Sequence, residues 1–167
     1  GGLAAAGEFS AGVAFRGVDV ERDAKVTLVQ EKLHAGTWLD ASDPKGVVVG
    51  RQLSRTLGVD PGDELIVLSQ GADGSMANDL FTIRGVLSSI AAGTDRTVVY
   101  MNDTTFRELM VLPTGAHQLI VRTPTDVELD VGKEAVVAAA AKVSPDINVM
   151  TWKELNPIVA QMMDGTK

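Results

Sequence analysis

The chain has 167 residues, a formal net charge of −7 and no cysteine, which excludes a disulfide framework, a thiol nucleophile and cysteine zinc sites. The acidic balance repels phosphate backbones, so no nucleic-acid partner is expected, and the low aromatic content of 4% predicts an aliphatic core. No apolar run approaches the roughly 20 residues of a membrane helix, and no signal peptide is visible. We expect both ends to be cuts in a longer polypeptide, so residues 1–7 and 162–167 are left out of the fold prediction.

The first third of the chain predicts a strand followed by a helix. Val13, Phe15 and Val18 alternate with smaller or polar residues up to Gly17, which is typical of a strand. Residues 21–35 are predicted to form a helix that Gly36 ends, because Val26, Val29 and Leu33 share one helical face. A polar loop over 40–45 follows.

Residues 47–67 read VVVGRQLSRTLGVDPGDELIV and predict a strand, a short helix, a tight turn and a second strand. Leu53 and Leu57 lie on one helical face, and Gly58 stands where a helix ends with a positive φ. Residues 60–63, Asp-Pro-Gly-Asp, are typical of a type II turn.

The middle of the chain predicts a β-hairpin between strands 64–69 and 79–88, joined by a flexible polar loop over 70–79. Residues 88–96 are predicted to be a loop. A short buried strand over 98–101 leads into a helix that Asn102 or Asp103 caps, whose buried face holds Phe106, Leu109 and Met110. Residues 113–115 break this helix.

The last third predicts strand 119–121, helix 126–142, strand 147–150 and a final helix. The buried face of helix 126–142 is predicted to hold Leu129, Val136, Val137 and Ala140. Thr151 and Glu154 fit a capping box, but Pro157 then falls inside the helix, so we expect a broken start with the main helix from Pro157 onward. Together these elements predict an α+β fold.

No residue pattern indicates a catalytic, cofactor-binding or metal site. His34 and His117 lack neighbouring ligands at metal spacing, and His34 is expected near a helix C-terminus. Asp60, Asp63 and Glu64 cluster at the predicted turn, where turn chemistry is favoured over acid–base work or calcium binding. The oxygen-rich stretch 73–79 lacks the spacing of a calcium loop. Trp38 and Trp152 are expected to be core anchors rather than ligand platforms.

The order of the motifs resembles a known family. A strand ending in Arg-Gly-Val-Asp at 16–19 precedes Gly-Thr-Trp-Leu at 36–39, then Val-Val-Gly at 48–50 and the Leu-Gly-Val turn of 57–63. Phe-Thr-Ile-Arg-Gly-Val at 81–86, Val-Val-Tyr-Met at 98–101 and Thr-Trp-Lys-Glu-Leu at 151–155 follow. Over residues 13–160 this set is similar to the periplasmic core domain of ABC-transporter permeases of the MacB and LolC/LolE type.

The resemblance implies a single extracytoplasmic domain over 1–167, anchored in the inner membrane by helices outside this sequence and facing the periplasm. A β-rich "sabre" subdomain over 36–95 would be inserted into an α/β "porter" subdomain over 9–35 and 98–164. The implied role is mechanical rather than enzymatic, and it couples ATP hydrolysis by a cytoplasmic ABC ATPase to substrate export or lipoprotein release. Implied partners are that ATPase, a second permease copy and a periplasmic adaptor or carrier.

Two departures and two alternatives accompany the resemblance. The loop 70–79 is short and lacks the proline of the LolC-type hook, which puts recruitment of a lipoprotein carrier in doubt. The first strand and helix of a porter subdomain are not evident before Phe9. The first alternative to a permease domain is a small-ligand binding module with a double-psi-like barrel around the turn at 57–63. The second alternative is an enzyme that uses Asp60, Asp63 and Glu64.

Overall fold

The computed structural model describes residues 1–164 and confirms a mixed α+β fold. These residues divide into two compact units, which meet in sequence between Leu119 and Ile120. The strands of the first unit are β1 Gly2–Ala6, β2 Phe9–Val18, β3 Leu33–Gly36, β4 Gly46–Val49, β5 Glu64–Gln70, β6 Met76–Leu87 and β7 Val98–Asn102. Its helices are α1 Val20–Asp23, a 3₁₀ turn over Val29–Lys32, α2 Arg51–Leu57, α3 Ala92–Thr97 and α4 Asp103–Met110.

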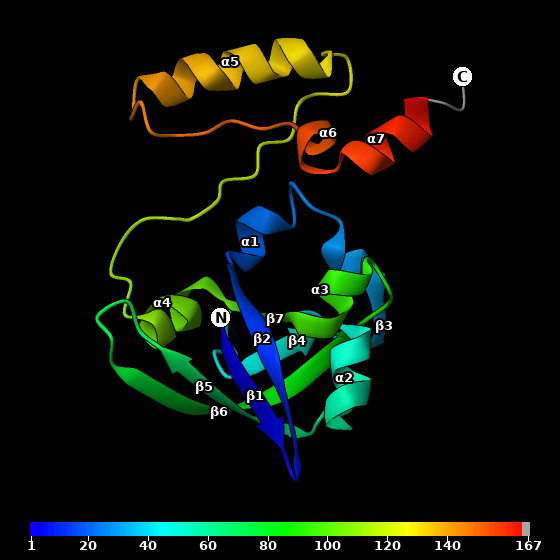
Figure 1. Ribbon diagram of the computed structural model, residues 1–167, viewed down its shortest axis with the longest axis vertical. Coiled ribbons are helices and arrows are strands. Elements are labelled where there is room, and N and C mark those ends of the chain that lie inside the picture. The colour runs from blue at the N-terminus through cyan, green and yellow to red at the C-terminus, as the bar shows by residue number, and fades with distance from the viewer. Residues whose placement is uncertain (165–167) are drawn as a thin grey trace. The chain divides into compact units, whose positions relative to one another are not determined.

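Six strands of the first unit close into a barrel (Figure 1). Their order is β6-β4-β7-β2-β1-β5, and β5 pairs with β6 to complete the circle. The β2–β7 and β4–β6 pairs are parallel, and the other neighbours are antiparallel. The short strand β3 lies outside the circle, against the far end of β6. Closure leaves the six barrel strands without a free edge.

Aliphatic side chains fill the barrel. Side chains alternate along each strand, so every second residue points inward, and α2 and α4 add their apolar faces to the same cluster. The buried members of this cluster, none of them more than 9% exposed, include Val13, Phe15, Val47, Val49, Leu53, Leu57, Leu65, Val67, Phe81, Ile83, Val99, Met101, Leu109 and Met110. The interior is therefore a packed core.

A second apolar cluster covers the outer face of β4 and β7. Val48 and Tyr100, which pair across these strands, point away from the barrel axis and are buried at 0% and 9% exposure. Val29, Leu33 and Trp38 pack against this cluster from the segment that precedes β4. Strands β4 and β7 are thus buried on both faces, which explains their unbroken apolar sequences.

Several predicted elements of the first unit are confirmed. Strand β4, helix α2, the β5–β6 hairpin, strand β7 and helix α4 form where predicted. Gly58 caps α2 with φ of 65° and Gly62 has φ of 99° in the predicted turn. A close approach explains another glycine, because a Cβ on Gly17 in β2 would lie 2.5 Å from Cβ of Phe106 in α4.

Three predictions for this unit are wrong, and one segment left out of the prediction forms a strand. Residues 21–35 form a single turn of α1, the 3₁₀ turn and β3 instead of one helix, since Val29 and Leu33 pack on the outer face of the barrel. Residues 2–6, left out of the prediction, form β1 and pair with both β2 and β5. The loop between β5 and β6 spans only residues 71–75, and part of the predicted loop 88–96 is helix α3.

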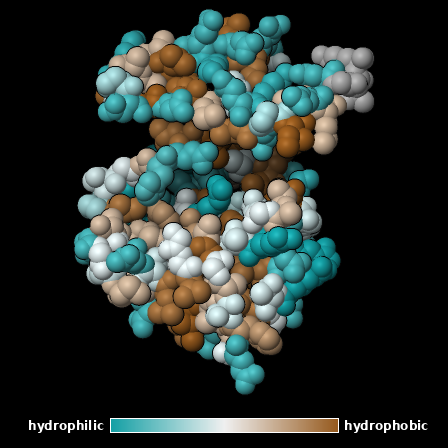
Figure 2. Space-filling view, in the orientation of Figure 1, coloured by the Kyte–Doolittle hydropathy of each residue, from teal (hydrophilic) through white to brown (hydrophobic). Residues whose placement is uncertain are grey.

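The second unit holds helices α5 Leu129–Ala141, α6 Trp152–Leu155 and α7 Pro157–Asp164. The predicted capping box is confirmed, because Thr151 Oγ1 accepts from the Glu154 N–H while Glu154 accepts from the Thr151 N–H. The broken start at Pro157 is confirmed as well. Figure 2 shows hydrophobic residues on the surface of this unit.

The predicted strands 119–121 and 147–150 are wrong, because these residues belong to no strand of the described chain. The buried face predicted for α5 is confirmed only in part. Val137 is 45% exposed, and Leu129, Val136 and Ala140 are only partly buried. Among residues 1–164, no helix has the length and apolar character that crossing a membrane requires.

Candidate functional site

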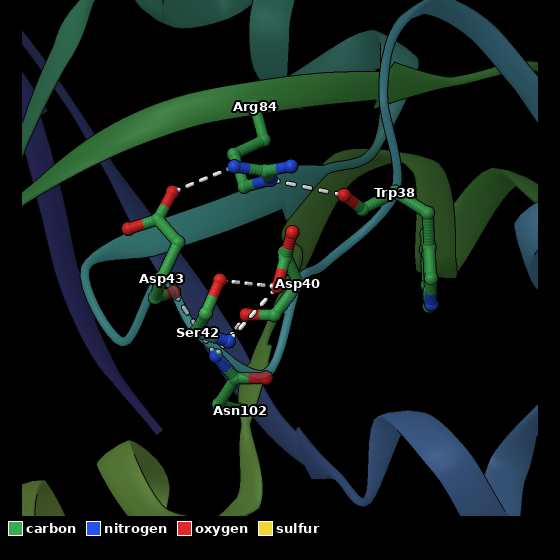
Figure 3. Close-up of polar contacts among 6 residues, drawn as sticks. All are labelled: Trp38, Asp40, Ser42, Asp43, Arg84 and Asn102. Atoms are coloured by element: carbon green, nitrogen blue, oxygen red, sulfur yellow. Dashed lines mark hydrogen bonds and ion pairs between the residues drawn. The ribbon is translucent and has the colours of Figure 1, made fainter.

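A connected set of polar contacts surrounds the loop between β3 and β4 (Figure 3). Arg84, on β6, holds both ends of this loop: its Nε donates to the Trp38 carbonyl at 3.0 Å, and its Nη1 donates to Asp43 Oδ2 at 2.7 Å. The Arg84 side chain is 25% exposed and that of Asp43 is 39% exposed. This partly buried, charge-assisted pair fixes the loop against the sheet.

Asn102, at the end of β7, fixes the middle of the same loop. Its amide Nδ2 donates to the carbonyls of Asp40 at 2.9 Å and Asp43 at 3.0 Å. Asn102 occupies the N-cap position of α4 as predicted, but its side chain makes no capping hydrogen bond. One turn later, Thr105 Oγ1 donates to the Pro44 carbonyl at 2.7 Å. These donors satisfy three carbonyls of a loop that lacks a strand partner.

Within the loop, Asp40 closes a local turn. Its Oδ1 accepts from the Ser42 N–H at 2.9 Å and from the Ser42 hydroxyl at 2.7 Å. Both hydrogen bonds favour the ionised carboxylate, so the pKa of Asp40 lies below its ordinary value. The carboxylate therefore serves the backbone of the loop.

Trp38 and Tyr100 meet beside this loop. Their ring centroids are 5.5 Å apart with an interplanar angle of 54°, an arrangement that aromatic pairs favour. Burial of the phenol raises the pKa of Tyr100 above its ordinary value. The prediction that Trp38 anchors a core is confirmed, since it packs against the second apolar cluster.

The predicted turn chemistry at 60–63 is confirmed. Asp63 Oδ2 accepts from the Asp60 N–H at 2.8 Å, and the Asp63 N–H donates to the Asp60 carbonyl at 3.0 Å. In the β5–β6 hairpin, Asp73 Oδ1 accepts from the Ser75 N–H and hydroxyl, which lowers the Asp73 pKa. Residues 1–164 contain no group of three or more His, Cys, Asp or Glu side chains placed to hold a metal ion.

The histidines lie apart. His34 is an exposed residue of β3, two positions after the 3₁₀ turn that ends at Lys32, so it does follow a helix C-terminus. The His117 ring meets Phe106 edge to face, with centroids 6.2 Å apart. The prediction that Trp152 is a core anchor is wrong, because it is 40% exposed and its ring lies under the Lys153 ammonium group at 5.8 Å.

Two open depressions mark the surface of the first unit. The larger, about 400 Å³, lies between the β1–β2 turn and the residues around the 60–63 turn, and Phe9, Val59 and Glu64 are among its lining residues. The smaller, about 250 Å³, is lined by Arg51, Gln52, Arg55, Ser89 and Asp95. In the smaller one, the carboxylate of Asp95 accepts hydrogen bonds from the Ser89 hydroxyl and from two backbone N–H groups, which lowers its pKa.

Sequence reasoning missed the part that Arg84 and Asn102 play. Arg84 reads as an ordinary outward residue of an alternating strand, and Asn102 reads as a helix cap. The one signal in the sequence is the loop over 40–45, which holds Pro44 and has no apolar periodicity. Such a loop forms neither helix nor strand, so its backbone carbonyls need hydrogen-bond donors from side chains.

No protein-family model matches the sequence. The search of curated proteins gave no match either.

Proposed function

We propose that this chain is the extracytoplasmic part of an ABC-transporter permease that couples cytoplasmic ATP hydrolysis to substrate export or lipoprotein release. The observation that carries the proposal is the ordered set of motifs over residues 13–160, together with the structural use of those motifs. The Leu-Gly-Val turn caps α2 and leads into β5, and the Gly-Thr-Trp-Leu stretch frames the clamped loop. On this proposal, residues 36–95 are sabre-like and residues 9–35 and 98–164 are porter-like, with strands of both parts joined in the one barrel.

The charged side chains of the first unit hold the backbone in place, which supports a mechanical role. Asp40, Asp63, Asp73 and Asp95 accept hydrogen bonds from nearby backbone N–H groups, and Arg84 clamps a loop. A barrel with a filled interior transmits displacement as a rigid body, because close-packed cores have low compressibility. A rigid β unit followed by a separate helical unit suits a domain that passes on motion.

The proposal is tested by locating the chain in intact cells. Because these 167 residues have no cysteine, Glu8→Cys adds the one thiol of this part, in the exposed β1–β2 turn, and it is made in a full-length gene product in which any other cysteines are replaced by serine. We expect a membrane-impermeant maleimide to label this variant in cells with permeable outer membranes and an intact inner membrane. The matched control, Leu53→Cys, has its thiol in the core and stays unlabelled.

Labelling of Glu8→Cys only after lysis of the inner membrane would overturn the proposal. A parent reading frame without an apolar span of about 20 residues on either side would contradict it too. If the chain is attached to the membrane and labelled from outside, the coupling to ATP hydrolysis is tested next. We expect the ATPase activity of the copurified ATPase to depend on an intact barrel.

A second candidate function is a small-ligand binding module. The closed six-stranded barrel with two parallel pairs favours it, because barrels of this kind carry ligands at their ends. The depression of about 400 Å³ beside the 60–63 turn offers the surface, with Phe9 58% exposed at its rim. A ligand there would raise the melting temperature of the chain but not that of Phe9→Ala.

A further inference from the structure

The smaller depression of the first unit lies where α2 meets α3, and Figure 1 shows both helices on one side of the barrel. Backbone contacts fix this meeting point. The Gly50 N–H, just before α2, donates to the Val98 carbonyl at 3.2 Å, and a Cβ on Gly50 would lie 2.5 Å from the Asp95 carbonyl oxygen. The depression of about 250 Å³ is lined only by polar and charged residues, which are Arg51, Gln52, Arg55, Ser89 and Asp95.

Two arginines of this lining have no counter-ion. Arg51 and Arg55 lie one turn apart on α2, so their side chains share a face of the helix. Within the described residues neither forms an ion pair, while three other arginines of the first unit each pair with an aspartate. The sequence around α2 is locally basic, because no carboxylate stands between Asp43 and Asp60. Guanidinium groups present forked N–H donors that match the oxygens of an oxoanion.

Asp95 gives the same depression an acceptor. The residue is 6% exposed, its Oδ1 accepts from the Ile90 and Ala91 N–H groups at 2.8 and 3.3 Å, and its Oδ2 accepts from the Ser89 hydroxyl. These hydrogen bonds, that of the hydroxyl first, lower the Asp95 pKa and favour the ionised carboxylate. A carboxylate oxygen accepts about two hydrogen bonds, so Oδ2 has room for one more donor.

Two cationic donors beside one anionic acceptor match an oxoanion that carries its own proton. At neutral pH inorganic phosphate has oxygens that accept from guanidinium groups and an O–H that donates. Sulfate has no O–H, and the dianion of a phosphate monoester has none either. A carboxylate in the depression repels those two ions but accepts from the O–H of phosphate. The volume also suits a small ion, because drug-sized ligands occupy pockets of roughly 300–1,000 Å³.

We propose that the depression between α2 and α3 binds inorganic phosphate. The guanidinium groups of Arg51 and Arg55 hold the charged oxygens of the ion, and the Gln52 amide beside them is a further donor. The O–H of the ion donates to Asp95. Because the depression is open to solvent, binding is expected in the millimolar range. This site has no part in the transport proposal, so the inference stands independently of it.

The test titrates the 167-residue chain with sodium phosphate at about pH 7.5 and constant ionic strength, followed by NMR. We expect the amide signals of residues 51–55 and 89–95 to shift along saturable curves. Arg51→Gln and Arg55→Gln are each expected to weaken phosphate binding about tenfold. The matched control, Arg107→Gln, removes the same charge from α4 on the other side of the barrel (Figure 1) and leaves binding unchanged. The dispersion of the spectra shows that the variants are folded.

Sulfate and methyl phosphate separate the contact to Asp95 from charge attraction. Sulfate has no O–H at this pH and methyl phosphate almost none, so both are expected to bind about tenfold more weakly than phosphate. Unshifted amide signals at about 50 mM phosphate would overturn the proposal, as would sulfate binding as tight as that of phosphate. Equal weakening by Arg107→Gln would refute it by showing that net charge alone acts. Tighter binding of methyl phosphate would show that the ligand is a phosphorylated molecule instead of the free ion, which also overturns it.

Discussion

Replacing Asn102 with aspartate separates two roles that this residue could have. As a helix cap, aspartate is as good as asparagine and interacts favourably with the N-terminus of α4. As the clamp seen in the structure, Asn102 must donate, because its amide faces the carbonyls of Asp40 and Asp43. Aspartate has no donor when ionised, so its carboxylate would face two carbonyl oxygens.

The expected losses follow from the two hydrogen bonds and the burial of the site. Asn102→Ala removes two bonds worth about 0.5–1.5 kcal/mol each, or about 1–3 kcal/mol in all. Asn102→Asp loses the same bonds and leaves an unpaired acceptor at a residue that is 4% exposed, which costs roughly 1–3 kcal/mol more. The order of stability is therefore wild type, then alanine, then aspartate.

Urea unfolding at pH 7 measures these differences. The chain has two tryptophans, so a Trp152→Phe background leaves Trp38, which packs against the barrel next to the clamped loop, as the only reporter. If Asn102→Asp unfolds at the same urea concentration as the parent, or a higher one, the residue is a cap and the clamp is wrong.

Three further predictions concern packing, backbone and charge. Leu53→Ala in the barrel core, at 0% exposure, is expected to lower the unfolding free energy by about 2–5 kcal/mol, while Leu68→Ala, 38% exposed on β5, costs much less in the same urea titration. Gly58→Ala places a Cβ at φ of 65° and is expected to cost about 1–2 kcal/mol by the same measurement; no loss would contradict the left-handed cap. The pKa of Glu154 is about 2, chiefly because Lys133 donates to it and then because the Thr151 N–H does. Because the pKa is lower in the folded chain, ionised Glu154 stabilises the second unit at pH values above about 4.5, the pKa of glutamate in the unfolded chain. This stabilisation is lost as the pH falls toward 2. In Lys133→Met, carboxyl NMR titration should show the Glu154 pKa rising toward its ordinary value, and an unchanged pKa would contradict the ion pair.

Local signals predicted much of the first unit. The apolar run at 47–49, the spacing of Leu53 and Leu57, and the turn at 60–63 each act over a few residues, so the sequence identifies them without knowledge of the fold. The capping box at Thr151 belongs to the same class. Asp63 could be assigned to the turn because its hydrogen bond to Asp60 joins residues three positions apart.

Long-range packing decided the elements that were predicted wrongly. Val26, Val29 and Leu33 have helical spacing, but the outer face of β4 and β7 takes up Val29 and Leu33 from an irregular segment. β1 consists of Gly, Leu and Ala, which have weak strand signals, and it forms because β2 and β5 supply partners on both sides. Residues 119–121 and 147–150 have the signal but lack a partner.

Arg84 and Asn102 show why the polar network could not be predicted from the sequence. Arg84 bonds residues 41 and 46 positions away, and Asn102 bonds residues 59 and 62 positions away. Nothing in the local pattern of either residue indicates these partners.

The parallel pairing of β2 with β7 also sets the order in which the chain can fold. The register joins Ala14 with Val98, so the barrel cannot close until residue 102 has been synthesised, about 4–17 s after β2 at ordinary synthesis rates, and, on the transport proposal, has crossed the membrane. During this interval the β1–β2 hairpin has an open edge on the β2 side, and folding must wait for contacts that are distant in sequence. A protein built this way is expected to fold slowly.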